Sequence, residues 1–137
     1  MAEVHESGEV GASVDEVWKL VGDFGGFPQA MGVAVELEGE GIGQTRKISA
    51  GRAPMVERLE ERDEDAKRLV YSIVEGALPV TDYRSTMQLS AAGGGRTKVD
   101  WSATFEPVEG TSLEDASSIL SRVYKGGIGG LQARFGS

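Results

Sequence analysis

The stretch RLVYSIVEGALPVTDYRSTMQLSAAGGGRTKVDWSATFE, residues 68–106, indicates three consecutive β-strands joined by tight turns. Apolar and polar side chains alternate through residues 68–76, 81–90 and 96–106, which is the period-two pattern of a half-buried strand. The connections GALPV and AAGGGR are short and rich in turn-forming residues, so neighbouring strands should pair antiparallel. This stretch therefore predicts an antiparallel meander with one buried face.

Further strand patterns precede this meander, at residues 3–10, 44–50 and 55–62 and in the segment VAVELEGEGIG. Between residues 3–10 and that segment, SVDEVWKLVGDF indicates a short helix with Ser13 as its N-cap. The GGFPQAM that follows permits only a broken helix or a second short one.

The C-terminal segment carries apolar residues at helical spacing from Leu113 to Leu131, and its opening TSLE predicts a capping box formed by Thr111 and Glu114. The predicted order is a strand, two short helices, about six strands and one long helix, which describes an α+β domain. The last helix must cover the apolar face of the sheet. We expect residues 1–137 to form this single domain, as a monomer or a homodimer.

The composition excludes several classes of chemistry. The chain has 137 residues, no cysteine and a single histidine, His5. Disulfides, thiolate metal ligands and cysteine nucleophiles are therefore excluded, and one histidine cannot supply a multi-histidine metal site. We accordingly expect neither a metal nor an organic cofactor.

The charge and the N-terminus bear on partners and location. A net charge of -8 argues against binding to nucleic acid or to an anionic membrane, because both require a concentrated basic surface. The N-terminal MAEVHESGEV lacks the apolar core of a signal peptide, and no uncharged run approaches the roughly 18 residues of a membrane-spanning helix. We therefore expect a cytoplasmic protein without membrane insertion.

Two glutamates lie on strand phases that otherwise carry apolar residues. Glu75 continues an apolar face that includes Ile73, and Glu57 shares the inward phase of its own strand. Because a buried, unpaired carboxylate is costly, an inward glutamate needs water, a ligand or an arginine beside it. Either both residues face a pocket, or Glu75 is solvated at the open end of its strand, alone or paired with Arg52 or Arg84.

The remaining inward positions are amphipathic rather than purely aliphatic. Several are tyrosines or a tryptophan, whose polar tips must find partners when they are buried, and a dry core tolerates such residues poorly. This pattern favours a ligand pocket between the sheet and the last helix. The residues expected to line the pocket are Glu57, Tyr71, Ile73, Tyr83, Ser85, Met87, Trp101, Ile119, Val123, Tyr124 and Gly127.

The last helix contains the run KGGIGGLQ, with glycine at positions 126, 127, 129 and 130. Each glycine inside a helix costs roughly 1 kcal/mol relative to alanine. Glycines that face the sheet, such as Gly127, would either let the helix and the sheet approach closely or leave volume for a ligand. The alternative is a helix that frays or ends near Lys125.

Five segments together resemble one family: SVDEVWKLVGDFGGFPQAM, GIGQTRKI, VERLEERDEDAKRLVYSIVEGALPVTDYRSTMQL, TKVDWSATFEP and the glycine-bearing helix. They look like the polyketide cyclase/dehydrase branch of the START-like (SRPBCC) superfamily, which also holds birch-pollen-allergen-like proteins and plant abscisic-acid receptors. The resemblance covers nearly the whole chain. It implies a helix-grip fold, in which a seven-stranded antiparallel sheet wraps a long C-terminal helix around a hydrophobic cavity.

The resemblance also extends to single positions. SAGRAPMVERL resembles the gate loop of the abscisic-acid receptors, and EGALPVTDY resembles their latch loop. This chain has AGRAP where the receptor gate reads Ser-Gly-Leu-Pro, and Gly32 where the receptors place a lysine that binds the ligand carboxylate. Glu57 matches a receptor position that contacts ligand through water, and Glu75 falls on a position that the receptors fill with glycine. The residues that match pocket-lining positions are Tyr71, Ile73, Tyr83 and Ser85.

Two functions follow. The first is a binding module for a small hydrophobic molecule such as a lipid, an isoprenoid, a polyketide or an aromatic compound. The second is a cofactor-free cyclase, dehydratase or isomerase in which Glu75 acts as acid or base. The onion lachrymatory-factor synthase, which the chain also resembles, uses a pocket arginine and glutamate, and this implies Arg46, Arg52 or Arg58 as the partner of Glu75.

Overall fold

The computed structural model describes residues 1–49, 54–76 and 78–137 of the chain. Its elements are, in chain order, β1 (Ala2–Val10), α1 (Val14–Val21), α2 (Gly26–Ala30), β2 (Ala34–Glu38), β3 (Thr45–Ser49), β4 (Met55–Asp63), β5 (Arg68–Glu75), β6 (Val80–Gly93), β7 (Arg96–Pro107) and α3 (Leu113–Phe135). The predicted order of elements is confirmed.

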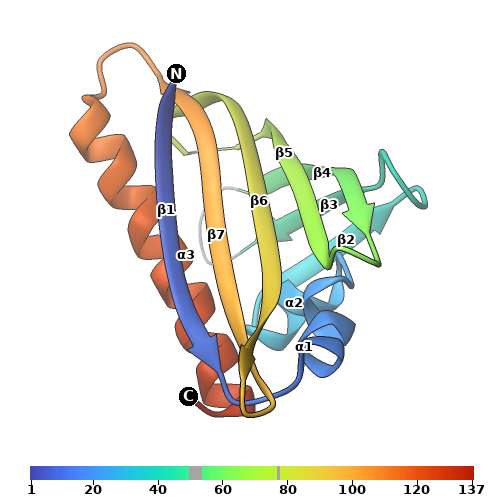
Figure 1. Cartoon of the computed structure of the whole chain (residues 1–137). Helices are drawn as coiled ribbons and strands as arrows, with labels where there is room; N and C mark the ends of the chain where they lie inside the picture. The colour runs from blue at the N-terminus through green and yellow to red at the C-terminus, as the bar shows by residue number, and fades with distance from the viewer. Residues whose placement is uncertain (50–53, 77) are drawn as a thin grey trace.

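The strands form a seven-stranded antiparallel sheet in the order β1-β7-β6-β5-β4-β3-β2. Strands β2 to β7 are a meander, and β1 pairs with β7 at the opposite end from β2. The sheet is curved, α3 lies along it against β1 and β7, and α1 and α2 lie beside its lower end (Figure 1). This is the predicted helix-grip arrangement, a curved sheet around a long C-terminal helix.

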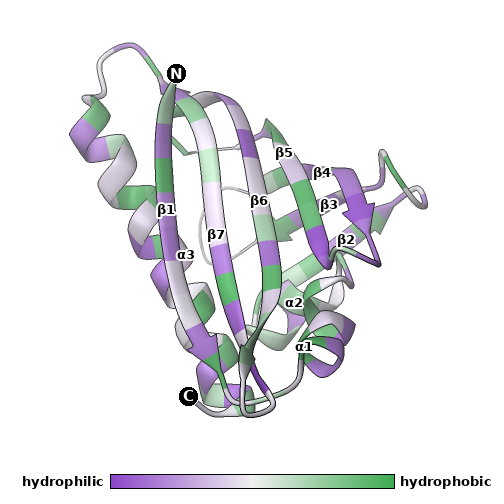
Figure 2. Cartoon of the chain, viewed as in Figure 1, coloured by the Kyte–Doolittle hydropathy of each residue, from purple (hydrophilic) through white to green (hydrophobic). Residues whose placement is uncertain are grey.

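Side chains alternate between a more buried and a more exposed face along β1 and β7. Hydrophobic and hydrophilic residues are interspersed along both strands (Figure 2). The face that packs toward α3 is the buried one. Its members on β6 and β7 are Tyr83, Ser85, Met87, Leu89, Val99, Trp101, Ala103 and Phe105. The core therefore lies between the sheet and α3, where the strand phases of the sequence predicted it.

Serine side chains cap both α1 and α3. Ser13 Oγ accepts a hydrogen bond from a backbone N–H in the first turn of α1 at 3.3 Å, as predicted. At α3 the cap is Ser112, whose Oγ accepts from the backbone N–H of Asp115 at 3.0 Å. The predicted capping pair, Thr111 and Glu114, is therefore wrong by one residue. Two adjacent hydroxyl residues fit the capping pattern equally well, so the sequence does not distinguish them.

Helix α3 continues through the glycine run to Phe135, so the alternative in which it ends near Lys125 is wrong. A Cβ placed on Gly127 would overlap Cζ3 of Trp101 and lie 2.9 Å from its Cη2. The absence of a side chain at this position thus lets the indole lie directly on the helix backbone. Close approach of helix and sheet is what offsets the poor helix propensity of this glycine.

Candidate functional site

A buried ion pair joins β3 and β4 on the inward face of the sheet. Arg46 and Glu57 lie directly opposite each other in the strand register, and Nε of Arg46 donates to Oε1 of Glu57 at 2.8 Å. Their exposed fractions are 5% and 4%. Nη1 of Arg46 also donates to the backbone carbonyl of Phe24 at 2.8 Å, and its guanidinium lies over the Phe24 and Tyr71 rings at 4.0 and 4.8 Å. The charged groups are thus paired and held in one position.

A cluster of hydroxyl and indole groups lies further along the same face. Nε1 of Trp101 donates to Oγ of Ser85 at 3.0 Å and to Oη of Tyr71 at 3.2 Å. Oγ of Ser85 lies 3.0 Å from Oη of Tyr124, which is hydrogen-bonded in turn to Oη of Tyr83. The cluster joins β5, β6, β7 and α3 through polar tips, as expected for buried tyrosine and tryptophan. We call these five residues the hydroxyl cluster.

The polar tips of the hydroxyl cluster lie among aromatic rings, most of which belong to the same residues. The Trp101 and Tyr124 rings stack with centroids 4.5 Å apart and an interplanar angle of 11°. Phe27, on α2, lies near the same indole, with its ring centroid 5.9 Å from that of Trp101. Tyr71 and Tyr83 lie 6.3 Å apart, centroid to centroid. The polar tips therefore meet inside an apolar, aromatic shell.

Burial changes the acidity of the tyrosines in the hydroxyl cluster. Burial, reinforced by the negative charge of Glu57, raises the pKa of Tyr71 to about 12. Burial likewise raises the pKa of Tyr83 and Tyr124. All three phenols are therefore neutral at physiological pH, so each can both donate and accept a hydrogen bond.

Glu75 is exposed rather than inward, which corrects the expectation drawn from strand phase. In the pairing of β4 with β5, Glu57 lies opposite Ile73, whereas the next residue, Val56, lies opposite Glu75. The register shift leaves Val74 without a partner, as in a β-bulge, and reverses the phase of the strand. Since paired residues share a face, Glu75 follows Val56 to the side opposite Glu57.

The other predicted pocket residues fall into three groups: buried, half-buried and exposed. The hydroxyl cluster, Glu57 and Met87 are buried on the inward face, and Gly127 lies against Trp101. Ile73 is half-buried against the core, and Ile119 is half-buried on α3. Val123 is 43% exposed, so the structure does not bring it to the cluster.

The partner of Arg46 was not identified from the sequence, which offered Arg46 for Glu75 instead. The signal was present: Arg46 and Glu57 both lie on inward phases of consecutive strands, and antiparallel pairing of these strands places them side by side. Arg58, the other described candidate, is exposed and lies 3.4 Å from Glu60. The third candidate, Arg52, and parts of the loops that resemble the gate and the latch fall at residues 50–53 and 77, outside the described residues.

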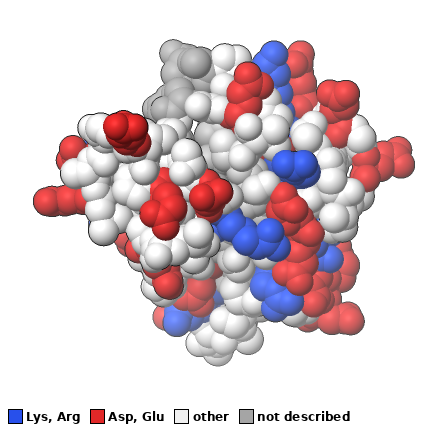
Figure 3. Space-filling view, turned by 90° about the horizontal axis from the view of Figure 1, so that it is seen from above, with Lys and Arg blue, Asp and Glu red and all other residues white. Residues whose placement is uncertain are grey.

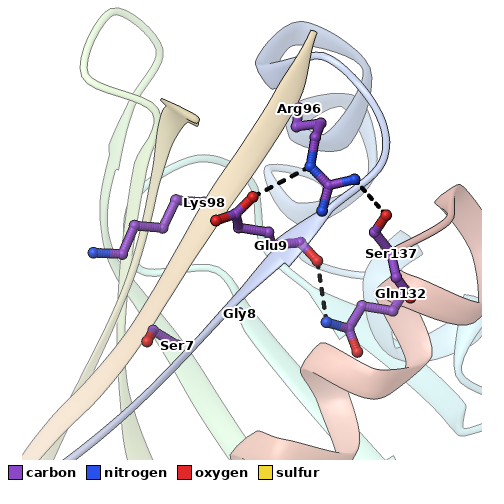
Figure 4. Close-up of a pocket in the computed structure, with 7 residues that line it drawn as sticks. All are labelled: Ser7, Gly8, Glu9, Arg96, Lys98, Gln132 and Ser137. Carbon is purple, nitrogen blue, oxygen red and sulfur yellow. Dashed lines mark hydrogen bonds and ion pairs between the residues drawn. The ribbon is translucent and has the colours of Figure 1, made fainter. Parts of the chain in front are cut away.

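A separate hollow of about 350 Å³ lies on the surface between β1, β7 and the end of α3 (Figure 4). Nε of Arg96 lies 3.2 Å from a carboxylate oxygen of Glu9, and Nη1 of Arg96 donates to the backbone of Ser137. Nε2 of Gln132 donates to the Glu9 carbonyl at 3.0 Å. These groups satisfy one another, in contrast to the aromatic surroundings of the inward face.

On the surface of the protein, charged side chains of both signs are intermixed. On the face shown in Figure 3, acidic side chains are spread widely, and basic side chains lie among them rather than in a separate patch. Within the described residues, no three His, Asp or Glu side chains converge to hold a metal ion. No helix in this part of the chain has the length and apolar character needed to cross a membrane.

Comparisons with known proteins agree with this geometry. The model of the family described as polyketide cyclase/dehydrase and lipid transport matches residues 1–136. No curated protein sequence matches the chain.

Solved structures with the same fold come from several bacteria. A protein of Bacillus thuringiensis is 30% identical with a TM-score of 0.89, and the alignment covers 98% of each chain. The protein XoxI of Bacillus cereus is 31% identical with a TM-score of 0.89, over 98% of this chain and 96% of that one. A protein of Thermobifida fusca, solved by NMR in solution, is 34% identical with a TM-score of 0.82, over 99% of this chain and 94% of that one.

Proposed function

Because this chain belongs to the polyketide cyclase/dehydrase and lipid transport family, we propose that it binds a small hydrophobic molecule between the sheet and α3. The candidate ligands are a lipid, an isoprenoid, a polyketide or an aromatic compound. The observation that carries the proposal is the hydroxyl cluster, which places several hydrogen-bonding groups inside an aromatic shell.

The hydroxyl cluster imposes a hydrogen-bonding requirement that an apolar core would not. Buried polar groups need partners, and aliphatic side chains of similar volume would fill this interior without that requirement. Hydroxyl oxygens have two acceptor positions and one donor each, so the cluster retains capacity for a further partner. A ligand with one oxygen-bearing group and a hydrophobic body matches this combination.

Half-buried apolar side chains on the inward face support the same proposal. Helix α3 packs mainly against β1 and β7. On β3, β4 and β5, the apolar side chains of Ile48, Met55 and Ile73 share the inward phase of the ion pair and remain half-buried. Covering this apolar surface would contribute roughly 25 cal/mol per Å² to ligand binding.

The first test is direct. The protein is purified without denaturant, extracted with organic solvent and the extract is read by mass spectrometry. The emptied protein, after unfolding in guanidinium and refolding, is then titrated with the neutral dye Nile red. We expect a hydrophobic compound in the extract and saturable dye binding at one site per chain, and dye binding that does not saturate would contradict the proposal.

A matched pair of variants locates the site. Ile73→Glu places a charge on the inward face and should weaken Nile red binding at least tenfold. Val74→Glu introduces the same charge one residue away, at the register shift, where the side chain is 50% exposed, and should leave dye binding unchanged. Equal effects of the two substitutions would show that the dye binds elsewhere.

The acid–base role of Glu75 stays a prediction. An acid or base that acts on a buried hydrophobic substrate must reach the interior, whereas the Glu75 carboxylate is exposed. The variant Glu75→Gln should accordingly keep the Nile red affinity of the wild type.

A further inference from the structure

We propose that the interior selects uncharged molecules that carry an oxygen atom, and that Glu57 sets this selectivity by neutralising Arg46. The inference rests on the proposed function, since it assigns the chemical class of the molecule bound on the same face. It makes Glu57 a specificity-determining residue rather than a catalytic one.

The buried charges of the described residues balance each other. Among the described residues, Arg46 and Glu57 are the charged side chains that are buried, and they contact each other at 2.8 Å. Within the described residues the buried charges therefore sum to zero. A ligand carboxylate that entered beside this pair would leave water and meet an arginine whose charge Glu57 already balances, so its desolvation would not be offset.

The guanidinium of Arg46 is held in place by contacts within the protein. Arg46 donates to Glu57 and to the Phe24 carbonyl, and the Phe24 and Tyr71 rings lie against its planar group. Turning toward a ligand anion would break these contacts and leave Glu57 unpaired in the interior. The arginine is thus committed to the protein, unlike a lysine or arginine that waits for a ligand carboxylate.

Besides the ion pair, the inward face carries the polar groups of the hydroxyl cluster. Serine, phenol and indole groups in the hydroxyl cluster are neutral, and they offer both donors and acceptors. Such groups suit a carbonyl, an ester or a hydroxyl. The wide spread of carboxylates over the face shown in Figure 3 and the net charge of -8 also lower the local concentration of anions.

The experiment compares two probes that differ by one charge. The probes are the fluorescent anion dansylaminoundecanoate and its methyl ester, and each is titrated into the emptied protein at neutral pH. We expect the wild type to bind the ester at least tenfold more tightly than the carboxylate. In Glu57→Gln, which leaves Arg46 unbalanced, the ratio of the two affinities should shrink at least tenfold through a gain in carboxylate binding.

Two further variants act as controls. Glu36→Gln removes one negative charge from the exposed surface of β2 and should keep the wild-type ratio. Arg46→Gln leaves Glu57 as an unbalanced acid and should weaken carboxylate binding further, at least threefold. Circular dichroism checks that each variant is folded. Where a variant does not fold, the ratio of ester to carboxylate affinity in the wild type tests the selectivity.

The outcomes separate the two proposals. Equal binding of both probes by the wild type, or an unchanged ratio in folded Glu57→Gln, would overturn the selectivity while leaving the proposed function intact. Binding of neither probe by the wild type would overturn the selectivity, and the Nile red titration would show separately whether the proposed function fails as well.

Discussion

Alanine substitutions in the glycine run of α3 should separate glycines that serve packing from those that do not. Gly126 and Gly129 face open space, so alanine there adds helix propensity without a clash. The expected gain is about 0.4–1 kcal/mol for each substitution. Alanine at Gly127 gains the same propensity, but its methyl group overlaps the Trp101 indole, which is buried and stacked on Tyr124.

At Gly127 the cost of overpacking opposes the gain in helix propensity. Overpacking a filled core costs about 1–3 kcal/mol, which exceeds the propensity gain, so Gly127→Ala should lose about 1 kcal/mol overall. Gly130 lies between the two cases, because its added methyl would overlap the sulfur of half-buried Met31. A methionine side chain is flexible enough to move, and Gly130→Ala should change stability by less than about 0.5 kcal/mol.

The assay is urea unfolding of the four single variants, followed by circular dichroism, with the thermal midpoint as a second reading. A stabilisation of 1 kcal/mol should raise Tm by about 3–5 °C in a chain of this size. The order of stability should be Gly126→Ala and Gly129→Ala above wild type, and Gly127→Ala below it. If Gly127→Ala were as stable as Gly126→Ala, the close contact between α3 and Trp101 would be refuted.

Three further predictions concern the ion pair, the cap and the tyrosines. Glu57→Ala leaves a buried guanidinium without its partner and should cost about 3–5 kcal/mol of unfolding free energy in urea, whereas Arg58→Ala, in an exposed pair, should cost less than about 1 kcal/mol. Ser112→Ala should destabilise the protein by about 1 kcal/mol in the same assay, and Thr111→Ala should have little effect. A larger loss in Thr111→Ala than in Ser112→Ala would show that Thr111 is the N-cap, as the sequence predicted. All three tyrosines of the chain are buried with a raised pKa, so ultraviolet absorbance should show no phenolate near pH 10 in the folded protein. Because the folded state holds these protons more tightly than the unfolded state, stability is intact below pH 10 and falls as the pH rises toward the Tyr71 pKa of about 12; a phenolate signal at pH 10 without unfolding would contradict this.

The fold was predictable because local patterns and global requirements agree. Alternation in the meander, short turns and one long amphipathic helix permit few arrangements, and the family resemblance selects one of them. The inward positions of Tyr71, Tyr83, Ser85 and Trp101 followed from strand phase alone.

The features that could not be predicted depend on register or on tertiary packing. Phase counting assumes unbroken alternation, and the register shift opposite Val74 reverses it just before Glu75. The helix cap was missed for a similar reason, since Thr111 and Ser112 differ by one position in the same pattern. The contact of Gly127 with Trp101 depends on tertiary packing, which sequence spacing does not specify.

The central claim is that a hydrophobic molecule binds beside the hydroxyl cluster, and the two tryptophans of the chain provide the most direct test. The indole N–H of Trp101 belongs to the cluster, whereas that of Trp18, on α1, donates to Glu64 at 2.6 Å. In a proton–nitrogen NMR titration of the emptied protein with the dansylaminoundecanoate methyl ester, the Trp101 indole signal should shift and saturate while the Trp18 signal stays in place. A shift confined to Trp18, or no shift of Trp101 at ligand saturation, would contradict the account.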